Sequence, residues 1–153
     1  MISLSLNRIL PGLFTAGVMA LSGAAGAATG NDVSPSLSVK DQSESFGRVT
    51  LHNVDMPANG FVVIHETRQG DGHGPVVGSA FAQAGHHAKV SVALDDSVQQ
   101  QEQLTAMLHL DTAERYEFEH GSDHPHLDPP VEREGHQVTR KFTVTDIVGD
   151  ESG

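Results

Sequence analysis

The stretch GFVVIHE, residues 60–66, is the clearest strand pattern in the chain. It is almost continuously apolar and rich in β-branched residues, a composition that is typical of a central strand. Turn-forming residues flank it on both sides, in the sequences MPANG and GDGHGP. Residues 60–66 are therefore expected to form a central β-strand.

Six further β-patterned runs lie on either side of this strand. They follow one another at spacings of roughly ten residues and are separated by turn residues, as in a β-sandwich. The runs are residues 36–40, 46–54, 75–82, 87–95, 103–111 and 137–148. Only SVQQQEQL, residues 97–104, admits a helix, and it lacks an apolar stripe. The pattern predicts an all-β protein: a single Ig-like antiparallel β-sandwich of about seven strands with Greek-key connections, over residues 36–148.

The N-terminal 28 residues have the features of a secretory signal peptide. Arg8 gives a positive start, an apolar run follows, and the sequence AAGAA places small residues before a cleavage point after Ala27 or Ala28. A retained membrane anchor would need about 20 continuous apolar residues, and this run is shorter. The sequence therefore predicts a secreted or periplasmic protein that is not embedded in a membrane.

The remaining segments outside the sandwich are short. Residues 29–35 form a polar lead-in, and residues 149–153 are expected to be a flexible tail. The chain contains no cysteine, so an exported domain must be held together by packing, or by packing and a bound ion.

The negative charge of the chain excludes polyanionic partners. After the predicted signal peptide there are 20 acidic residues against eight basic ones, since Arg8 is removed, which gives a net charge of −12. Such a surface repels the phosphates of nucleic acids and anionic membranes. Salt screens the repulsion between the acidic side chains, so the composition suits either simple solubility or a salt-rich, halophilic setting.

Two segments carry a resemblance to a known family. They are GFVVIHE (residues 60–66) and LTAMLHLDT (residues 104–112), and with the sequences around them they resemble an uncharacterised β-sandwich domain. That domain is common in secreted and surface proteins of halophilic archaea and also occurs in bacteria. The resemblance covers about residues 46–146. It implies a β-sandwich in an extracytoplasmic setting, and it implies no activity.

The chain departs from this family in one loop. Members often continue from the second segment as HLDTNGNGxYDF, a loop rich in oxygen ligands that could hold calcium. Here the sequence is HLDTAERYEFEHG, with Ala113, Glu114 and Arg115 in place of the Asn- and Gly-rich turn. This departure argues against a calcium loop at this position.

His65 and His109 form the first candidate site. If Val62 and Ile64 face the core, then His65 points to the outer face of its strand. His109 lies opposite the leucine-rich face of residues 103–111 and also points outward. If the two strands pair, the imidazoles approach each other, and together with Met107 or Asp111 they could bind zinc or copper. The alternative is that each histidine only covers a strand face and forms local hydrogen bonds.

The second candidate site is the loop HGSDHPHLD, residues 120–128. The two histidines around Pro125 lie in extended geometry, which puts both rings on one side. The possible ligands for zinc, copper or nickel are His120, Asp123, His124 and His126. The alternative is an open, solvated loop, since Pro125, Pro129 and Pro130 keep it extended and ordering it costs entropy.

An enzyme is not expected. There is no cysteine and no Gly-x-Ser-x-Gly motif, and no pair of carboxylates lies in an apolar setting. The sequence favours a non-enzymatic module with a structural, adhesive or binding role in the cell envelope, whose partner is an envelope or extracellular surface. No cofactor is required. The alternative is a soluble periplasmic carrier of zinc or copper.

Overall fold

The computed structural model describes residues 33–69, 73–113, 116–120, 124 and 126–148. The predicted signal peptide and C-terminal tail lie outside these ranges. The described chain forms ten strands and contains no helix, so it contains none that could cross a membrane. The all-β sandwich predicted from the sequence is confirmed.

One layer of the sandwich is built around β3 (Arg48–Met56). β3 pairs in antiparallel orientation with β6 (Gly85–Ala93) on one side. On its other side it pairs with β1 (Ser36–Ser38) and β2 (Gln42–Ser45). The C-terminal half of β10 (Thr139–Val148) then joins β2. The β2–β10 pairing is parallel, which departs from the antiparallel arrangement that we expected throughout.

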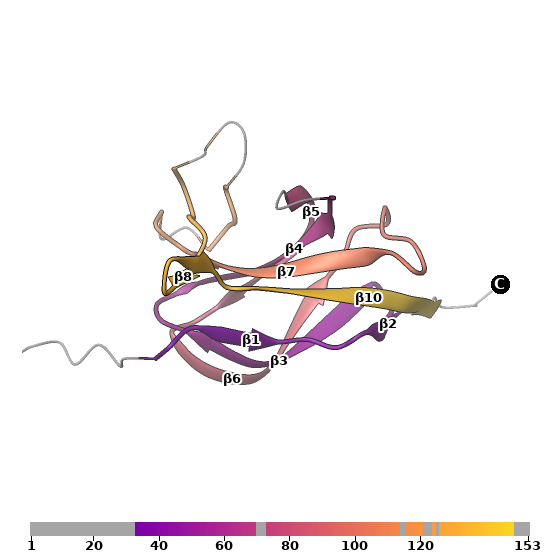
Figure 1. The fold of residues 1–153 in the computed structure, drawn as a ribbon, viewed down its shortest axis with the longest axis horizontal. Coiled ribbons are helices and arrows are strands. Elements are labelled where there is room, and N and C mark those ends of the chain that lie inside the picture. The colour runs from indigo at the N-terminus through magenta and orange to yellow at the C-terminus, as the bar shows by residue number, and fades with distance from the viewer. Residues whose placement is uncertain (1–32, 70–72, 114–115, 121–123, 125, 149–153) are drawn as a thin grey trace, which may run out of the picture.

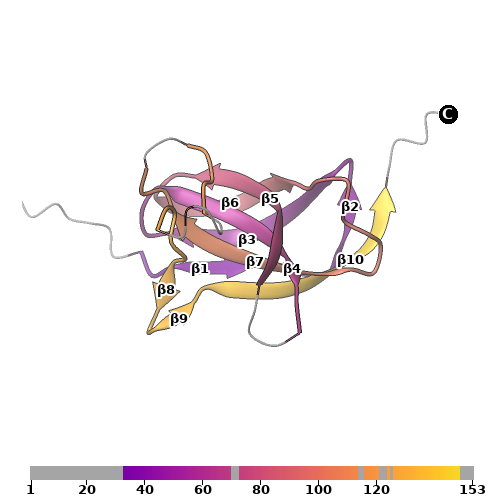
Figure 2. The ribbon, with the colours of Figure 1, turned by 90° about the horizontal axis from the view of Figure 1, so that it is seen from above.

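The second layer follows the order β5, β4, β7, β10. β4 (Gly60–Thr67) lies between β5 (His73–Ala82) and β7 (Gln103–Leu110). The N-terminal half of β10 pairs with β7. Because its other half pairs with β2, β10 belongs to both layers and closes the sandwich along one side (Figures 1 and 2).

The core lies between the two layers. The alternating runs each send one face inward, as expected for half-buried strands, while β4 is buried on both faces. The buried core residues include Val49, Leu51, Val54, Val62, Ile64, Val92, Leu104, Ala106, Leu108, Phe142 and Val144.

Three short strands were not expected from the sequence. β2 is one of them, and β8 (Glu132–Arg133) and β9 (His136–Gln137) form a separate two-stranded hairpin. Both turn residues of this hairpin, Glu134 and Gly135, have positive φ angles of 54° and 79°, a combination that suits tight two-residue hairpins. Strands of two to four residues leave too short an alternation to be recognised in a sequence.

Candidate functional site

The outer face of β4 is buried although it points away from the core. Val62 and Ile64 pack between the layers, so Phe61, Val63 and His65 lie on the opposite face of the strand. All three are buried, with His65 only 7% exposed. Val62 and Ile64 thus face the core, and His65 lies on the outer face of its strand, as expected from the sequence in that case.

β7 contributes its own outer-face residues beside β4. Met107 and His109 are each only 1% exposed. The two strands are antiparallel neighbours, with His109 opposite Phe61 and Met107 opposite Val63. The second condition for an approach of the two histidines, the pairing of their strands, is therefore met.

The connection between β7 and β8 covers this outer face. The ring of Phe118 packs edge-on against Phe61 and His109, with centroid distances of 5.6 Å and 4.9 Å. The returning chain then continues the sheet, since the Val131 amide donates to the Leu108 carbonyl at 2.8 Å. In Figure 1 the coloured, described parts of this connection rise above the layer that contains β4 and β7.

Four histidines meet under this cover. The ring centroids of His65 and His109 are 6.0 Å apart, and those of His109 and His120 are 5.2 Å apart. His73, from the start of β5, lies 5.5 Å from His65. With Met107 these side chains line a pocket of ≈ 470 Å³. The fold thus brings residues from β4, β5, β7 and the β7–β8 connection to one place.

Hydrogen bonds fix the tautomer of three of these rings. Each Nδ1 atom lies close to a backbone carbonyl oxygen: His65 to Gly74 at 3.0 Å, His109 to Asp128 at 2.6 Å, and His120 to Leu127 at 2.8 Å. A carbonyl oxygen only accepts hydrogen bonds, so each Nδ1 carries the proton and donates it. In the neutral ring the Nε2 atom is then left with a free lone pair.

Two of these Nε2 atoms have no hydrogen-bond partner. They belong to His65 and His109, and both are buried. Burial lowers the pKa of His109 to about 4, although its hydrogen bond to the Asp128 carbonyl acts in the opposite direction. The pKa of His65 is also lowered, again chiefly by burial. Both rings are therefore neutral near pH 7.

The covering connection is held in place by Asp128, which is fully buried. Its carboxylate accepts hydrogen bonds from the amides of Thr112 at 3.1 Å and Glu119 at 2.8 Å. Its own amide donates to the Thr112 hydroxyl at 3.1 Å. Its carbonyl also accepts a hydrogen bond from the His109 ring. Asp128 therefore links both ends of the connection to the histidine cluster.

The low pKa of His109 predicts that acid destabilises the metal-free protein. The unfolded chain binds a proton near pH 6.5, whereas the folded chain binds it only near pH 4. The stability that comes from neutral His109 is therefore complete above pH 6.5 and is lost as the pH falls toward 4. We expect the free energy of unfolding, measured with urea in the presence of EDTA, to fall by about 2 kcal/mol between pH 7 and pH 5.

Two variants test the origin of this loss. His109→Gln should remove the part of the pH dependence that comes from His109, because glutamine does not titrate, and leave the part that comes from His65. His126→Gln, at an exposed position in the same connection, should leave it unchanged. An equal pH dependence in His109→Gln and the unaltered protein would contradict the assignment.

The structure separates the loop residues predicted as metal ligands. Of these, His120 turns toward His109 and joins the buried cluster. His124 and His126 are exposed, and Asp123 lies outside the described residues. The structure therefore joins one residue of the second candidate site to the histidine pair of the first, and His73 completes the cluster.

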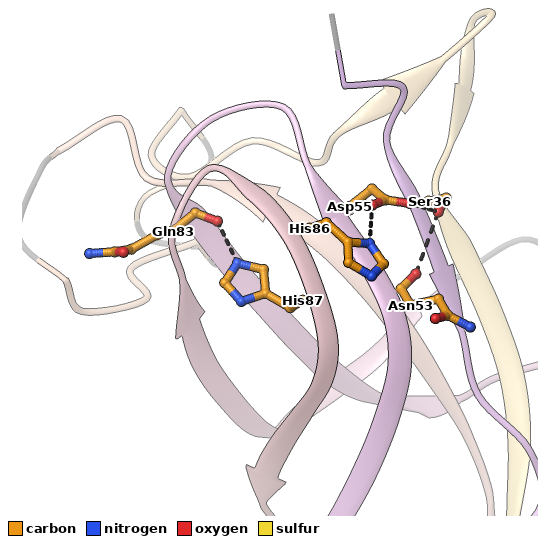
Figure 3. Close-up of polar contacts among 6 residues, drawn as sticks. All are labelled: Ser36, Asn53, Asp55, Gln83, His86 and His87. Carbon is orange, nitrogen blue, oxygen red and sulfur yellow. Dashed lines mark hydrogen bonds and ion pairs between the residues drawn. The ribbon is translucent and has the colours of Figure 1, made fainter. Parts of the chain in front are cut away.

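The doublet His86–His87 does not point both rings at one place (Figure 3). His86 Nδ1 lies 2.6 Å from the carboxylate of Asp55, whereas His87 Nε2 donates to the Gln83 carbonyl at 2.7 Å. Hydrogen bonds from Ser36 and then from His86 hold the pKa of Asp55 below its ordinary value. The doublet thus serves two separate local contacts.

Sequence reasoning missed His73, Phe118 and Asp128 as parts of this region. His73 stands in a glycine-rich turn that we took as a plain surface loop. Phe118 and Asp128 follow no strand periodicity, so no pattern placed them over β4 and β7. The one available signal was composition, since aromatic residues and histidines are concentrated in residues 109–128.

The arrangement is not a closed metal site. In the part of the chain that the structure describes, no three His, Asp or Glu side chains are placed to hold a metal ion together. What it does offer is a half-covered pocket with an apolar floor and two buried nitrogen lone pairs. These are features of a ligand-binding pocket.

Fold and site together define an acidic, all-β sandwich domain with a histidine-lined pocket beneath a long connection. Residues 35–145 match the family model described as a domain of unknown function, DUF7282. The match covers most of the chain, so the chain belongs to this family. The resemblance that we inferred from the sequence is confirmed.

Two relatives come from the archaeon Haloarcula hispanica. Cell surface glycoprotein 2 is 31% identical over 110 residues, which cover 71% of this chain and 11% of the relative. Cell surface glycoprotein 1 is 32% identical over 118 residues, which cover 75% of this chain and 12% of the relative. The chain thus spans only about a tenth of the length of these proteins. No solved structure gives a significant match.

Proposed function

We propose that this protein is a non-enzymatic β-sandwich module of the cell surface or envelope, with a structural, adhesive or binding role. The observation that carries the proposal is the similarity of most of the chain to segments of two cell surface glycoproteins. A module of this kind needs a self-contained core, and the two layers described above supply one. Its partner is another envelope component or an extracellular surface.

The strongly acidic composition supports an extracellular, salt-rich setting. Between two described residues, the only ion pair that joins an arginine or lysine to a carboxylate is Arg133–Glu134, at 3.9 Å and well exposed. The acidic side chains of the described surface are thus mostly not neutralised by neighbouring cations. Salt in the surroundings would screen their mutual repulsion.

Export of the full chain tests the proposal. A version with a C-terminal tag, expressed in a bacterial host, should appear in the envelope fraction or the medium with a mature N-terminus at Ala28 or Thr29, as measured by mass spectrometry. Val18→Asp interrupts the apolar run of the predicted signal peptide, so this variant should remain inside the cell at full length. Retention of the unaltered chain in the cytoplasm, or an intact Met1 on the exported form, would contradict the proposal.

The charge also predicts a dependence of stability on salt. The melting temperature of the mature protein should rise by several degrees as NaCl is increased from low to physiological strength and beyond, because the net charge of −12 is screened. KCl should have the same effect, since screening does not depend on the identity of the cation. A melting temperature that stays constant or falls as either salt is added would show that repulsion does not limit the stability of the fold.

A further inference from the structure

We propose that the pocket on the outer face of β4 and β7 binds one copper(I) ion, through the Nε2 atoms of His65 and His109 and the thioether sulfur of Met107. This inference goes beyond the proposed function, which requires no metal. It rests on three features of the pocket: the orientation of the two rings, the distance between them, and the position of the methionine.

The two imidazoles are already oriented as metal ligands. In each, Nδ1 donates to a backbone carbonyl, of Gly74 for His65 and of Asp128 for His109. A hydrogen bond of this kind usually fixes the tautomer and ring orientation of a metal-bound histidine. The Nε2 atoms that remain are buried and without a partner. Leaving a buried acceptor without a partner costs free energy, and a bound cation would remove that cost.

The spacing of the rings fits one shared ion. Imidazole nitrogens lie about 2 Å from a bound metal, so two rings on one ion have centres about 5–6 Å apart, the larger value when they stand almost opposite each other. The centroids of His65 and His109 are 6.0 Å apart. With both Nε2 atoms bound to one ion between the rings, this distance requires a wide nitrogen–metal–nitrogen angle, which suits copper(I) with two or three ligands.

Met107 lies between the two histidines. It precedes His109 by two residues on the same face of β7, and it stands opposite Val63, two residues before His65 on β4. Its side chain lines the same pocket and is buried. Met107 therefore lines the pocket between the two histidine positions, and its thioether is the proposed third ligand.

This ligand set selects copper(I) over zinc. A thioether is a soft ligand that favours copper(I), and it contributes nothing to a zinc site built from nitrogen, oxygen and thiolate ligands. Zinc prefers four ligands, and no three His, Asp or Glu side chains of the described ranges converge on one point. The proposed ligands are also all neutral, and a monovalent ion costs less to bury among neutral ligands than a divalent one.

The test is a titration of the exported protein with copper(I), under reducing and anaerobic conditions, with bicinchoninate as the competing chelator. We expect one ion per chain. His65→Gln and Met107→Leu should each weaken copper(I) binding by about tenfold or more, since even changes outside the ligand shell cost that much. Met107→Leu keeps the volume of the side chain and should fold normally, which circular dichroism checks. It should leave any weak zinc binding unchanged.

The matched control is the double variant His124→Gln/His126→Gln, in which the two exposed histidines of the connection are removed. It should bind copper(I) as the unaltered protein does. X-ray absorption of the copper(I) complex should show both imidazole nitrogen and sulfur as ligands. The proposal is overturned by binding that does not saturate, by zinc binding as tight as copper(I) binding, by loss of binding in the double variant, or by a spectrum without sulfur. None of these results would affect the proposed surface role.

Discussion

Phe142→Ala is expected to lower the free energy of unfolding by about 4 kcal/mol, which is typical of removing a fully buried aromatic ring. Phe142 is 2% exposed and belongs to the core cluster. It stands opposite Leu104 in the pairing of β10 with β7. Because β10 belongs to both layers, a cavity at this position weakens the strand that joins them.

The matched control for this prediction is Phe46→Ala. Phe46 lies in the turn between β2 and β3 and is 70% exposed, so the same substitution should change the free energy by about 0.5 kcal/mol or less. Urea unfolding of both variants in the same salt gives the comparison, and the m value should stay constant. Equal losses in the two variants would mean that the sandwich core is not where the structure places it.

Asp128→Ala should cost about 3 kcal/mol, because the amides of Thr112 and Glu119 lose a charged acceptor in a buried setting. The connection over β4 and β7 should then loosen, and Phe61 should become accessible to a hydrophobic dye. Urea unfolding measures the first effect and dye fluorescence at low urea measures the second.

Two further variants separate the causes of this loss. Asp128 has a φ of 47°, a left-handed conformation that asparagine tolerates better than alanine does. Asp128→Asn keeps this preference and one acceptor oxygen, so it should lose clearly less than Asp128→Ala. Asp96→Ala, at an exposed position, should have little effect. A loss in Asp128→Ala no larger than that in Asp96→Ala would remove the structural role assigned to Asp128.

The sandwich could be predicted from the sequence because its long strands carry the pattern themselves. The alternation in residues 46–54 and 87–95 defines which side chains enter the core, and the continuous run in residues 60–66 identifies a central strand. The same face argument correctly put His65 and His109 side by side. Each of these inferences depends only on residues close together in the chain.

The cover over the second face of β4 could not be predicted in this way. Its burial depends on residues 116–120 and 126–131 packing across β4 and β7, and a connection without periodicity does not indicate which surface it covers. For the same reason, nothing in the sequence showed that His120 turns inward while His124 and His126 stay exposed. The parallel pairing of β2 with β10 joins segments about a hundred residues apart, and a four-residue strand carries no signal of its partner.

That parallel pairing determines how the domain responds when its two ends are pulled. The described chain begins at one end of the long axis of the molecule and finishes at the other (Figure 1). β2 is the strand of this pair nearer the N-terminus and β10 runs to the C-terminus, side by side and in the same direction. Tension between the ends therefore slides the two strands along each other and stretches their hydrogen bonds together, instead of opening them one at a time. In a module tethered at one end and attached to a partner at the other, this is the geometry that resists mechanical unfolding.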